Sequence, residues 1–174
     1  MSKIIRQSIV MLALLTLLTG VVYPLVVTGI AQLAFPRTAN GSLIMQDGKP
    51  VGSTLIGQPF SDPKYFWSRP SATSPQPYNG AASSGSNLGP RNPALADAVA
   101  ARIKALRDAD PGNTAMIPTD LVTTSASGLD PDISPAAAEF QAARVARVRG
   151  LPLPAVEALV AQHTEGRTLG VLGD

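Results

Sequence analysis

The chain has 174 residues, of which 45% are apolar and 15% charged, with 16 prolines, 15 glycines and no cysteine. This length fits one domain with an appendage, and the missing cysteines exclude a disulfide framework, a thiolate metal site and a cysteine nucleophile. Of the 14 basic residues only Lys3 and Arg6 precede position 37, and the 12 that follow match the 12 acidic residues in number. The net charge of +2 therefore lies at the N-terminus and indicates no nucleic-acid partner.

The first predicted element is a membrane-spanning helix over residues 8–35. Residues 7–36 form a run of 30 uncharged residues, and about 20 apolar residues are enough to cross a bilayer. A cleaved signal peptide is the alternative, with Lys3 and Arg6 as its basic region and Gly29-Ile30-Ala31 as its cleavage site. Because such peptides have an apolar region of only about 7 to 15 residues, the run favours a retained anchor.

The basic N-terminus predicts the orientation of this span, since Lys and Arg near a span stay on the cytoplasmic side. Residues 1–7 are expected in the cytoplasm, and residues 36–174 are expected to form one domain outside it. Small residues recur at helical spacing along the span and favour close contact with another helix, although chance small residues on a plain anchor are the alternative. This face consists of Ala13, Thr16, Gly20, Pro24, Thr28 and Ala31. Pro24 also predicts a kink, because it removes one backbone hydrogen bond.

A β-hairpin is predicted directly after the span. Residues 40–60 contain two short apolar runs around Asp47-Gly48, a typical hairpin turn. Tyr65, Phe66 and Trp67 follow and are expected to supply the core of a small domain, with an aromatic recognition surface as the alternative. Residues 70–90 carry no charge and are rich in Ser, Gly, Pro and Asn, which predicts a loop.

Three helices and one strand are predicted in the rest of the chain. The first helix begins at Asn92 and Pro93 and ends near Asp108. The second begins at Ser134 and Pro135 and ends before Gly150. The third covers residues 154–164. Residues 117–124 are rich in β-forming residues. The predicted fold class is α+β, with mixed α/β layers, one N-terminal transmembrane helix and a single extracytoplasmic domain.

The residues that could carry chemistry form no catalytic or metal-binding constellation. His163 is the only histidine, and helical spacing places it on the apolar face of the third helix, where a structural role is favoured over catalysis. Asp130-Pro131-Asp132 lacks the further acids and the glycine of an EF-hand loop and favours a turn. Residues 83–89 could form an anion-binding nest but lack the lysine of a phosphate-binding loop, so a plain turn is favoured.

Several stretches of the chain together resemble the C subunit of the Kdp-type potassium-transporting P-type ATPase. They are GSTLIGQPF (52–60), YFWSRPSA (65–72), SSGSNLGP (83–90), TTSASGLDPDISPAAAEFQAARVARVRG (123–150) and LVAQHTEGRTLGVLG (159–173). The motif residues are Gly57, Gln58, Arg69, Pro70, Ser71, Ser127, Gly128, Leu129, Asp130, Pro131, Ser134, Gln141 and Arg144. Ser84 stands where the family usually has a second glycine.

The resemblance implies a non-catalytic accessory subunit of a potassium uptake complex in the bacterial inner membrane, crossing it once. Its implied partners are a channel-like potassium-binding subunit, an ATP-hydrolysing subunit and a small peptide subunit, and these handle potassium and ATP, so no cofactor is expected in this chain. The family is described as a catalytic chaperone that raises the ATP affinity of the hydrolysing subunit. This implies a weak nucleotide role for Ser84, Gly85, Ser86 and Asn87, but a domain outside the cytoplasm cannot touch ATP, so we expect an indirect effect through the span.

Two other classes are compatible with parts of the sequence. A pilin-like or other membrane-anchored periplasmic assembly protein also has an apolar N-terminal helix before an α/β domain, although pilin helices usually carry an early acidic residue and residues 7–36 have none. A secreted hydrolase would have to use His163, the only histidine.

Overall fold

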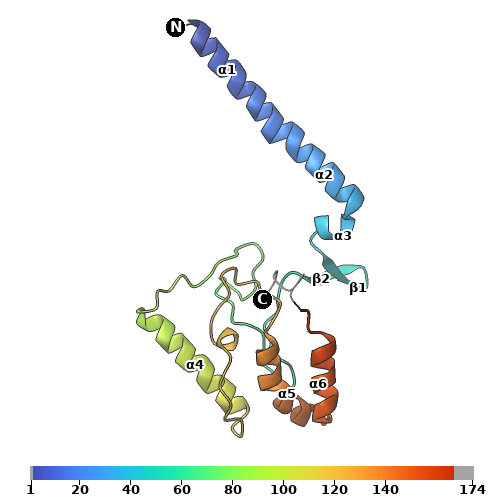
Figure 1. Ribbon diagram of the computed structural model, residues 1–174, viewed down its shortest axis with the longest axis vertical. Helices are drawn as coiled ribbons and strands as arrows, with labels where there is room; N and C mark the ends of the chain where they lie inside the picture. The colour runs from blue at the N-terminus through green and yellow to red at the C-terminus, as the bar shows by residue number, and fades with distance from the viewer. Residues whose placement is uncertain (1, 167–174) are drawn as a thin grey trace. The chain divides into compact units, whose positions relative to one another are not determined.

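The computed structural model describes residues 2–166 of the chain and divides it into two compact units, Met1–Thr54 and Leu55–Asp174. The first unit holds a long apolar helix and the hairpin, and the second holds the remaining helices and the long irregular segments (Figure 1). The fold is therefore a mixture of helix and sheet with one N-terminal apolar helix, as the sequence predicts.

The apolar helix is continuous from Ser2 to Ala34, and its 33 residues have a mean hydropathy of 2.4 in their most apolar stretch. It consists of α1 (Ser2–Leu17), a π-helical turn η1 (Leu18–Val22) and α2 (Tyr23–Ala34) (Figure 1). Pro24 is the second residue of α2 and lies inside the continuous helix, where its missing N–H removes one backbone hydrogen bond to the preceding turn. The irregularity that Pro24 predicts thus takes the form of a π turn directly before it, a common way for a helix to absorb such a residue.

The hairpin follows a single helical turn, α3 (Pro36–Ala39), and consists of β1 (Leu43–Gln46) and β2 (Lys49–Ser53). The strands are antiparallel, with Gln46 opposite Lys49 and a bulge where Ile44 gives way to Met45. Asp47 and Gly48 both have positive φ, 50° and 74°, as a two-residue primed turn requires. The predicted hairpin and its turn are confirmed.

The second unit contains α4 (Pro93–Ala109), α5 (Pro135–Arg149), α6 (Leu153–Gln162) and a short 3-10 helix, η2 (Thr119–Leu121). The Asn92 side chain accepts a hydrogen bond from the Ala94 N–H, and that of Ser134 accepts one from Ala137, so both predicted N-caps are confirmed. Gly150 ends α5 with a φ of 66°, the left-handed conformation in which glycine is least strained.

The strand predicted over residues 117–124 is wrong. Thr119 uses its carbonyl to accept hydrogen bonds from Val122 and Thr123, which closes the η2 turn, and Pro118 before it has no N–H to give to a neighbouring strand. Within residues 55–166 the structure has no β-strand, so the two-stranded hairpin of the first unit is the whole sheet among the described residues. The expected α/β layers are therefore replaced by helices and loops that pack on one another.

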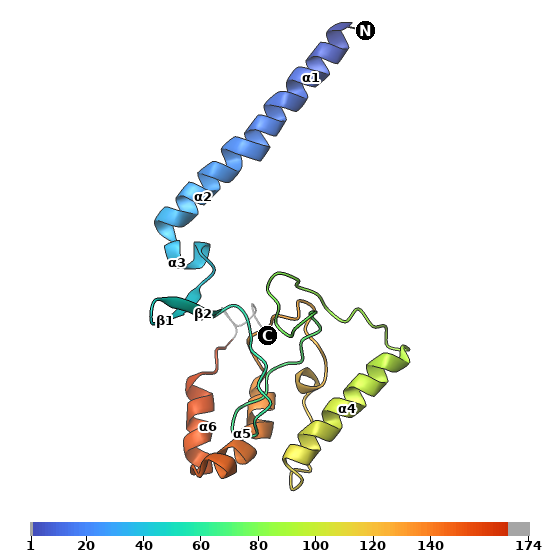
Figure 2. The same cartoon turned by 180° about the vertical axis from the view of Figure 1, so that it is seen from behind.

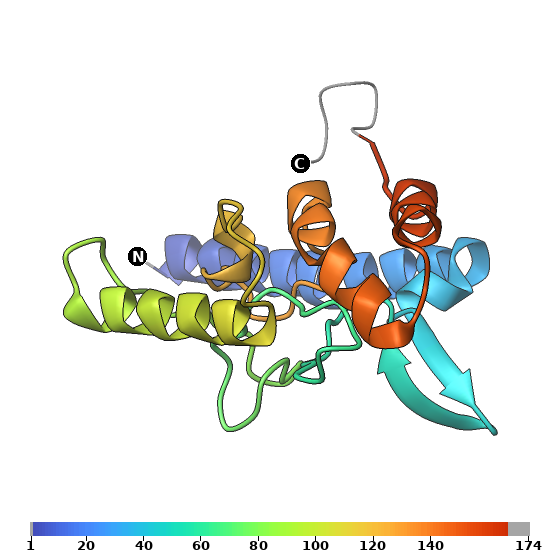
Figure 3. The same cartoon turned by 90° about the horizontal axis from the view of Figure 1, so that it is seen from below.

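Two small apolar clusters form the core of the second unit. One contains Leu106 of α4, Leu121 of η2 and Ala137 of α5, and half-buried Trp67 packs against it. The other joins Ala142 and Ala146 of α5 to Val156 of α6, with Phe66 beside them. α5 and α6 lie side by side from the front, from behind and from below (Figures 1, 2 and 3). Phe66 and Trp67 thus serve the core as predicted, whereas Tyr65 is exposed.

Candidate functional site

Most of the family-motif residues meet where the irregular segment after the hairpin lies against the turn at 127–130. The Gly57 N–H donates to the Leu129 carbonyl at 2.9 Å, and the Ser84 N–H donates to the Ser127 carbonyl at the same distance. Because these backbone bonds join residues far apart in sequence, the segment from 55 to 90 is a docked part of the domain and not a free loop.

Glycines allow the close approach at this turn. A side chain at Gly57 would overlap the Tyr78 ring and lie 2.7 Å from the Asp130 carbonyl oxygen, and one at Gly85 would lie 2.9 Å from that of Ala126. Gly128 has a φ of 68° and presses against Ser84. The motif glycines are therefore steric requirements of the docked loop.

Three hydroxyl groups hold the loop in place from inside. Ser71 donates to the Gly128 carbonyl at 2.7 Å, Thr73 donates to the Gln76 carbonyl at 2.7 Å, and Tyr78 donates to the Arg69 carbonyl. Burial raises the pKa of Tyr78, because the phenolate would lose its hydration there. Only Ser71 belongs to the predicted set, and single hydroxyls in a Ser-rich segment give no signal by which Thr73 and Tyr78 could have been found.

Arg69 and Asp130 form an ion pair across the same contact. Their Nη1 and Oδ2 atoms are 3.0 Å apart, and both side chains are about 30% exposed. The other Asp130 oxygen accepts the Asp132 N–H at 3.1 Å, which closes the turn predicted at 130–132, and this turn leads to the Ser134 cap. The predicted turn is confirmed, and Asp130 has a partner that the sequence reasoning did not assign.

Gln141 and Arg144 join α5 to the aromatic segment. The Trp67 N–H donates to Gln141 Oε1 at 2.8 Å, and Gln141 Nε2 donates back to the Trp67 carbonyl at 3.1 Å. Arg144, 2% exposed, donates to the carbonyls of Pro63 and Tyr65, and its guanidinium lies 5.0 Å from the Trp67 ring centre. Burial lowers the pKa of Arg144 from its usual value.

The arginines of α5 have different partners. Arg144 is an interior cation bound by carbonyl oxygens, and Arg147 pairs with buried Asp110 after α4 at 2.7 Å. The position of a helix end is visible in the sequence, but which of its arginines faces inward depends on packing that the sequence does not show.

The remaining predicted residues are spread around the docked loop. The Gln58 carbonyl accepts the Ser68 hydroxyl at 2.8 Å, Pro70 is half-buried, and Pro131 is exposed. Of the predicted nucleotide loop, Ser86 accepts a hydrogen bond from Thr124 at 3.3 Å, and Asn87 has a φ of 52°. The Ser84 N–H donates to the Ser127 carbonyl. This amide therefore stabilises the loop itself, whereas an anion-binding nest would need it to point at the anion.

His163 does not lie on the apolar face of its helix. It is exposed at the C-cap of α6, where its Nδ1 lies 2.9 Å from the Leu159 carbonyl oxygen. The prediction of its position is wrong because α6 ends at Gln162, directly before His163. A carboxylate or hydroxyl partner for catalysis is absent from the contacts of His163 within the described residues.

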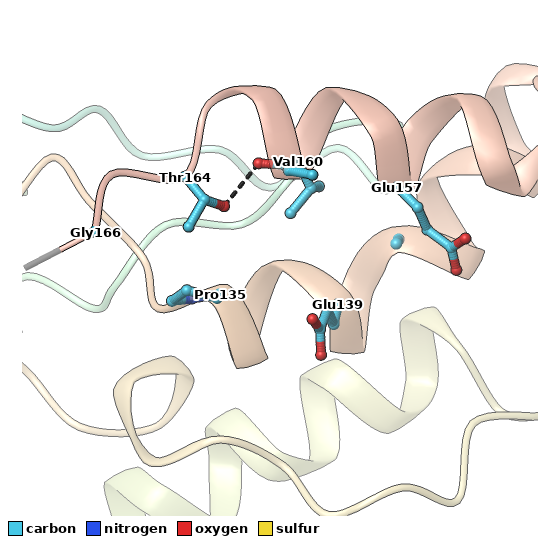
Figure 4. A pocket seen from close by; sticks show the side chains of 8 residues that line it. Pro135, Glu139, Glu157, Val160, Thr164 and Gly166 are labelled. Atoms are coloured by element: carbon cyan, nitrogen blue, oxygen red, sulfur yellow. Dashed lines mark hydrogen bonds between the residues drawn. The ribbon is translucent and has the colours of Figure 1, made fainter.

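A groove lies between α5 and α6, with a volume of about 640 Å³. Ala142 and Val160 contribute to its apolar lining, and Glu139 and Glu157 stand on its two helices (Figure 4). No group of three or more acidic, histidine or cysteine side chains that could hold a metal ion occurs within residues 2–166.

The predicted small face of the apolar helix is uncovered by the chain itself. Within the most apolar stretch of the helix none of the residues is buried. Counting about 100° per residue and the π turn as one inserted residue, the six residues Ala13, Thr16, Gly20, Pro24, Thr28 and Ala31 lie within an arc of about 100°. The π turn thus leaves the two halves of the face on the same side of the helix.

Fold and site together define a small loop-rich domain carried by one apolar helix, in which the motif residues hold the domain together and the helix surface is left open. The family model described as "K+-transporting ATPase, c chain" matches residues 5–174. Potassium-transporting ATPase KdpC subunits from Polaromonas naphthalenivorans and Variovorax paradoxus are 69% and 66% identical over the whole chain and 89% and 90% of their own lengths. That of Methylococcus capsulatus is 64% identical over 97% of the chain and 89% of its own length. The chain belongs to this family of KdpC subunits of the potassium-transporting ATPase.

Proposed function

We propose that the chain is a non-catalytic accessory subunit that assembles with a channel-like potassium-binding subunit, an ATP-hydrolysing subunit and a small peptide subunit. The observation that carries the proposal is the uncovered apolar helix, whose small face suits close packing against a neighbouring helix in lipid. ATP and potassium are handled by the partners, and this chain needs no cofactor of its own.

In this proposal the second unit lies outside the cytoplasm, because Lys3 and Arg6 hold the N-terminus inside. The chaperone effect on ATP affinity is then indirect. The docked helix stabilises one conformation of its neighbours, and the equilibrium between their conformations changes the affinity. Direct contact between ATP and residues 84–87 has no part in it.

Paired glycine substitutions test the docking face. Gly20→Leu places a bulky side chain within the small face, whereas Gly29→Leu adds the same side chain outside the arc, where nothing lies within 4 Å of the new Cβ. We expect Gly20→Leu to lower recovery of the complex by co-purification about tenfold, as a loss of about 1.4 kcal/mol of contact would, and Gly29→Leu to leave it unchanged. Equal recovery of both variants would refute docking through this face.

A cysteine label tests the orientation, since the chain has no cysteine of its own. Met116 is 93% exposed, so Met116→Cys offers an accessible thiol on the second unit. An impermeant thiol reagent should label it in intact cells. Labelling only in inverted membrane vesicles would reverse the orientation and make a direct nucleotide role for residues 84–87 physically possible again.

A further inference from the structure

The hairpin presents large apolar side chains that the other described residues of the first unit do not cover. Leu43, Ile44, Met45 and Val51 are 48%, 44%, 56% and 51% exposed. A two-stranded ribbon has no core of its own and is marginal in water, so these side chains need a covering surface from outside the ribbon.

The apolar residues lie on both faces of the ribbon. Successive side chains of a strand point to opposite faces, so Ile44 and Met45 face opposite sides, and both are about half exposed. A ribbon docked on a protein buries one face and keeps the other polar. Apolar side chains on both faces suit an apolar medium that surrounds the ribbon.

The hairpin is tied to the end of the apolar helix. The side-chain amides of Gln32 in α2 and Asn40 after α3 exchange two hydrogen bonds, of 3.0 and 3.2 Å. Ser42 N–H donates to the Arg37 carbonyl at 2.9 Å, and Ser53 Oγ donates to the Gly41 carbonyl at 2.7 Å. These hydrogen bonds connect the base of the hairpin to α3 and to the last turns of the apolar helix, which ends at Ala34.

The exposed surface of the helix end continues into the hairpin. Leu33 and Phe35 are 88% and 65% exposed, so the helix ends on exposed apolar side chains, and only α3 and residues 40–42 separate them from Leu43 along the chain. Arg37 in α3 and Lys49 next to the turn flank these apolar residues along the chain, as basic residues near a membrane surface do, and Asp47 of the turn is the acidic residue beside Lys49.

We propose that the hairpin β1–β2 is a second membrane-contacting element, which seats Leu43, Ile44, Met45 and Val51 among the headgroups and upper acyl chains beside the spanning helix. Its occupant is the lipid surface. The proposal requires only that Ser2–Ala34 crosses the bilayer, and it is independent of which subunits the helix contacts.

An environment-sensitive fluorophore on a single cysteine tests this in the full chain, reconstituted alone in vesicles of phosphatidylethanolamine and phosphatidylglycerol. Met45→Cys probes the hairpin, and Met116→Cys is the matched control, an exposed methionine of the second unit. We expect blue-shifted emission at position 45, quenching by lipids brominated high on the acyl chain, and an iodide quenching constant several-fold smaller than at position 116. Val51→Cys repeats the measurement should the label at 45 disturb the turn.

Two outcomes would overturn the proposal. Labels at 45 and 51 that are as open to iodide as the label at 116 would show that lipid does not cover the hairpin. Labels that become shielded only when the other subunits of the complex are present would assign the hairpin to a protein partner. The glycine test of the docking face reports on a different surface, so the failure of one proposal leaves the other standing.

Discussion

The two units of the chain use apolar residues in opposite ways. Among the described residues of the first unit, 2–54, Ser42 is the only one that is buried, and the large apolar residues of α1, α2 and the hairpin are exposed. In the described part of the second unit, Leu106, Leu121, Val145 and Val156 are 3 to 5% exposed. The large apolar side chains of the first unit stay exposed, whereas those of the second unit pack in its own core.

The contrast indicates that the family-motif residues contribute to the fold of the second unit. They lie in the second unit, where they bind one another and the loop backbone, while the surface that suits assembly lies in the first unit, where the sequence looks like an ordinary anchor. Substitutions in the second unit should therefore change stability, and substitutions in the first unit should change assembly. Trp67, the only tryptophan, lies in the core of the second unit, so its emission during urea unfolding reports on that unit alone.

The largest effect is expected from Arg144→Met. The methionine keeps the apolar volume but leaves the carbonyls of Pro63 and Tyr65 without the donors they have now, so we expect a loss of about 3 kcal/mol in the free energy of unfolding. Urea titration followed by Trp67 emission measures it. Arg144→Lys keeps the charge but loses the planar guanidinium, so its free energy of unfolding should lie between those of the parent and Arg144→Met. A loss below about 0.5 kcal/mol would mean that Arg144 is not part of the core.

A smaller effect is expected from Gly57→Ala. The added methyl group would overlap the Tyr78 ring and the Asp130 carbonyl, and such overpacking costs about 2 kcal/mol. Gly112→Ala is the matched control, since nothing lies within 4 Å of its new Cβ, and it should change stability by less than about 0.5 kcal/mol. Equal urea midpoints for the two variants would show that the loop is not docked on the turn at 130.

Tyr78→Phe should cost about 1 kcal/mol, because the hydrogen bond to the Arg69 carbonyl is lost. Burial raises the folded pKa of Tyr78 above the unfolded value of about 10. The stability linked to this group is therefore fully present below pH of about 10 and is lost as the pH rises through the folded pKa. The variant should lose less stability than the parent between neutral and alkaline pH.

The smallest effect is expected from Met45→Ser in the hairpin. Met45 contributes nothing to the core clusters of the second unit, so the Trp67 transition should move by less than about 0.5 kcal/mol. A shift of a full kcal/mol would show that the two units unfold together and would break the contrast between them.

Local signals in the sequence predict the elements well. The caps at Asn92 and Ser134 and the turn at Asp47-Gly48 each depend on a few adjacent residues, and the structure confirms all three. The strand predicted at 117–124 fails because a strand needs a partner, and the backbone there closes on Thr119 instead. The pairing of Gln141 with Trp67 joins positions 74 residues apart, which neither composition nor periodicity reveals.

The docked loop also affects how fast backbone amides of the second unit exchange their hydrogen for solvent deuterium. Residues 55–90 contain no helix or strand, yet Gly57, Ser84 and Trp67 each donate their backbone N–H to a partner in the 127–141 region. These amides should open only when the whole unit opens, so their deuterium uptake should be as slow as that of α5. A stretch that looks like a linker in the sequence would then carry the slow-exchange signature of a core.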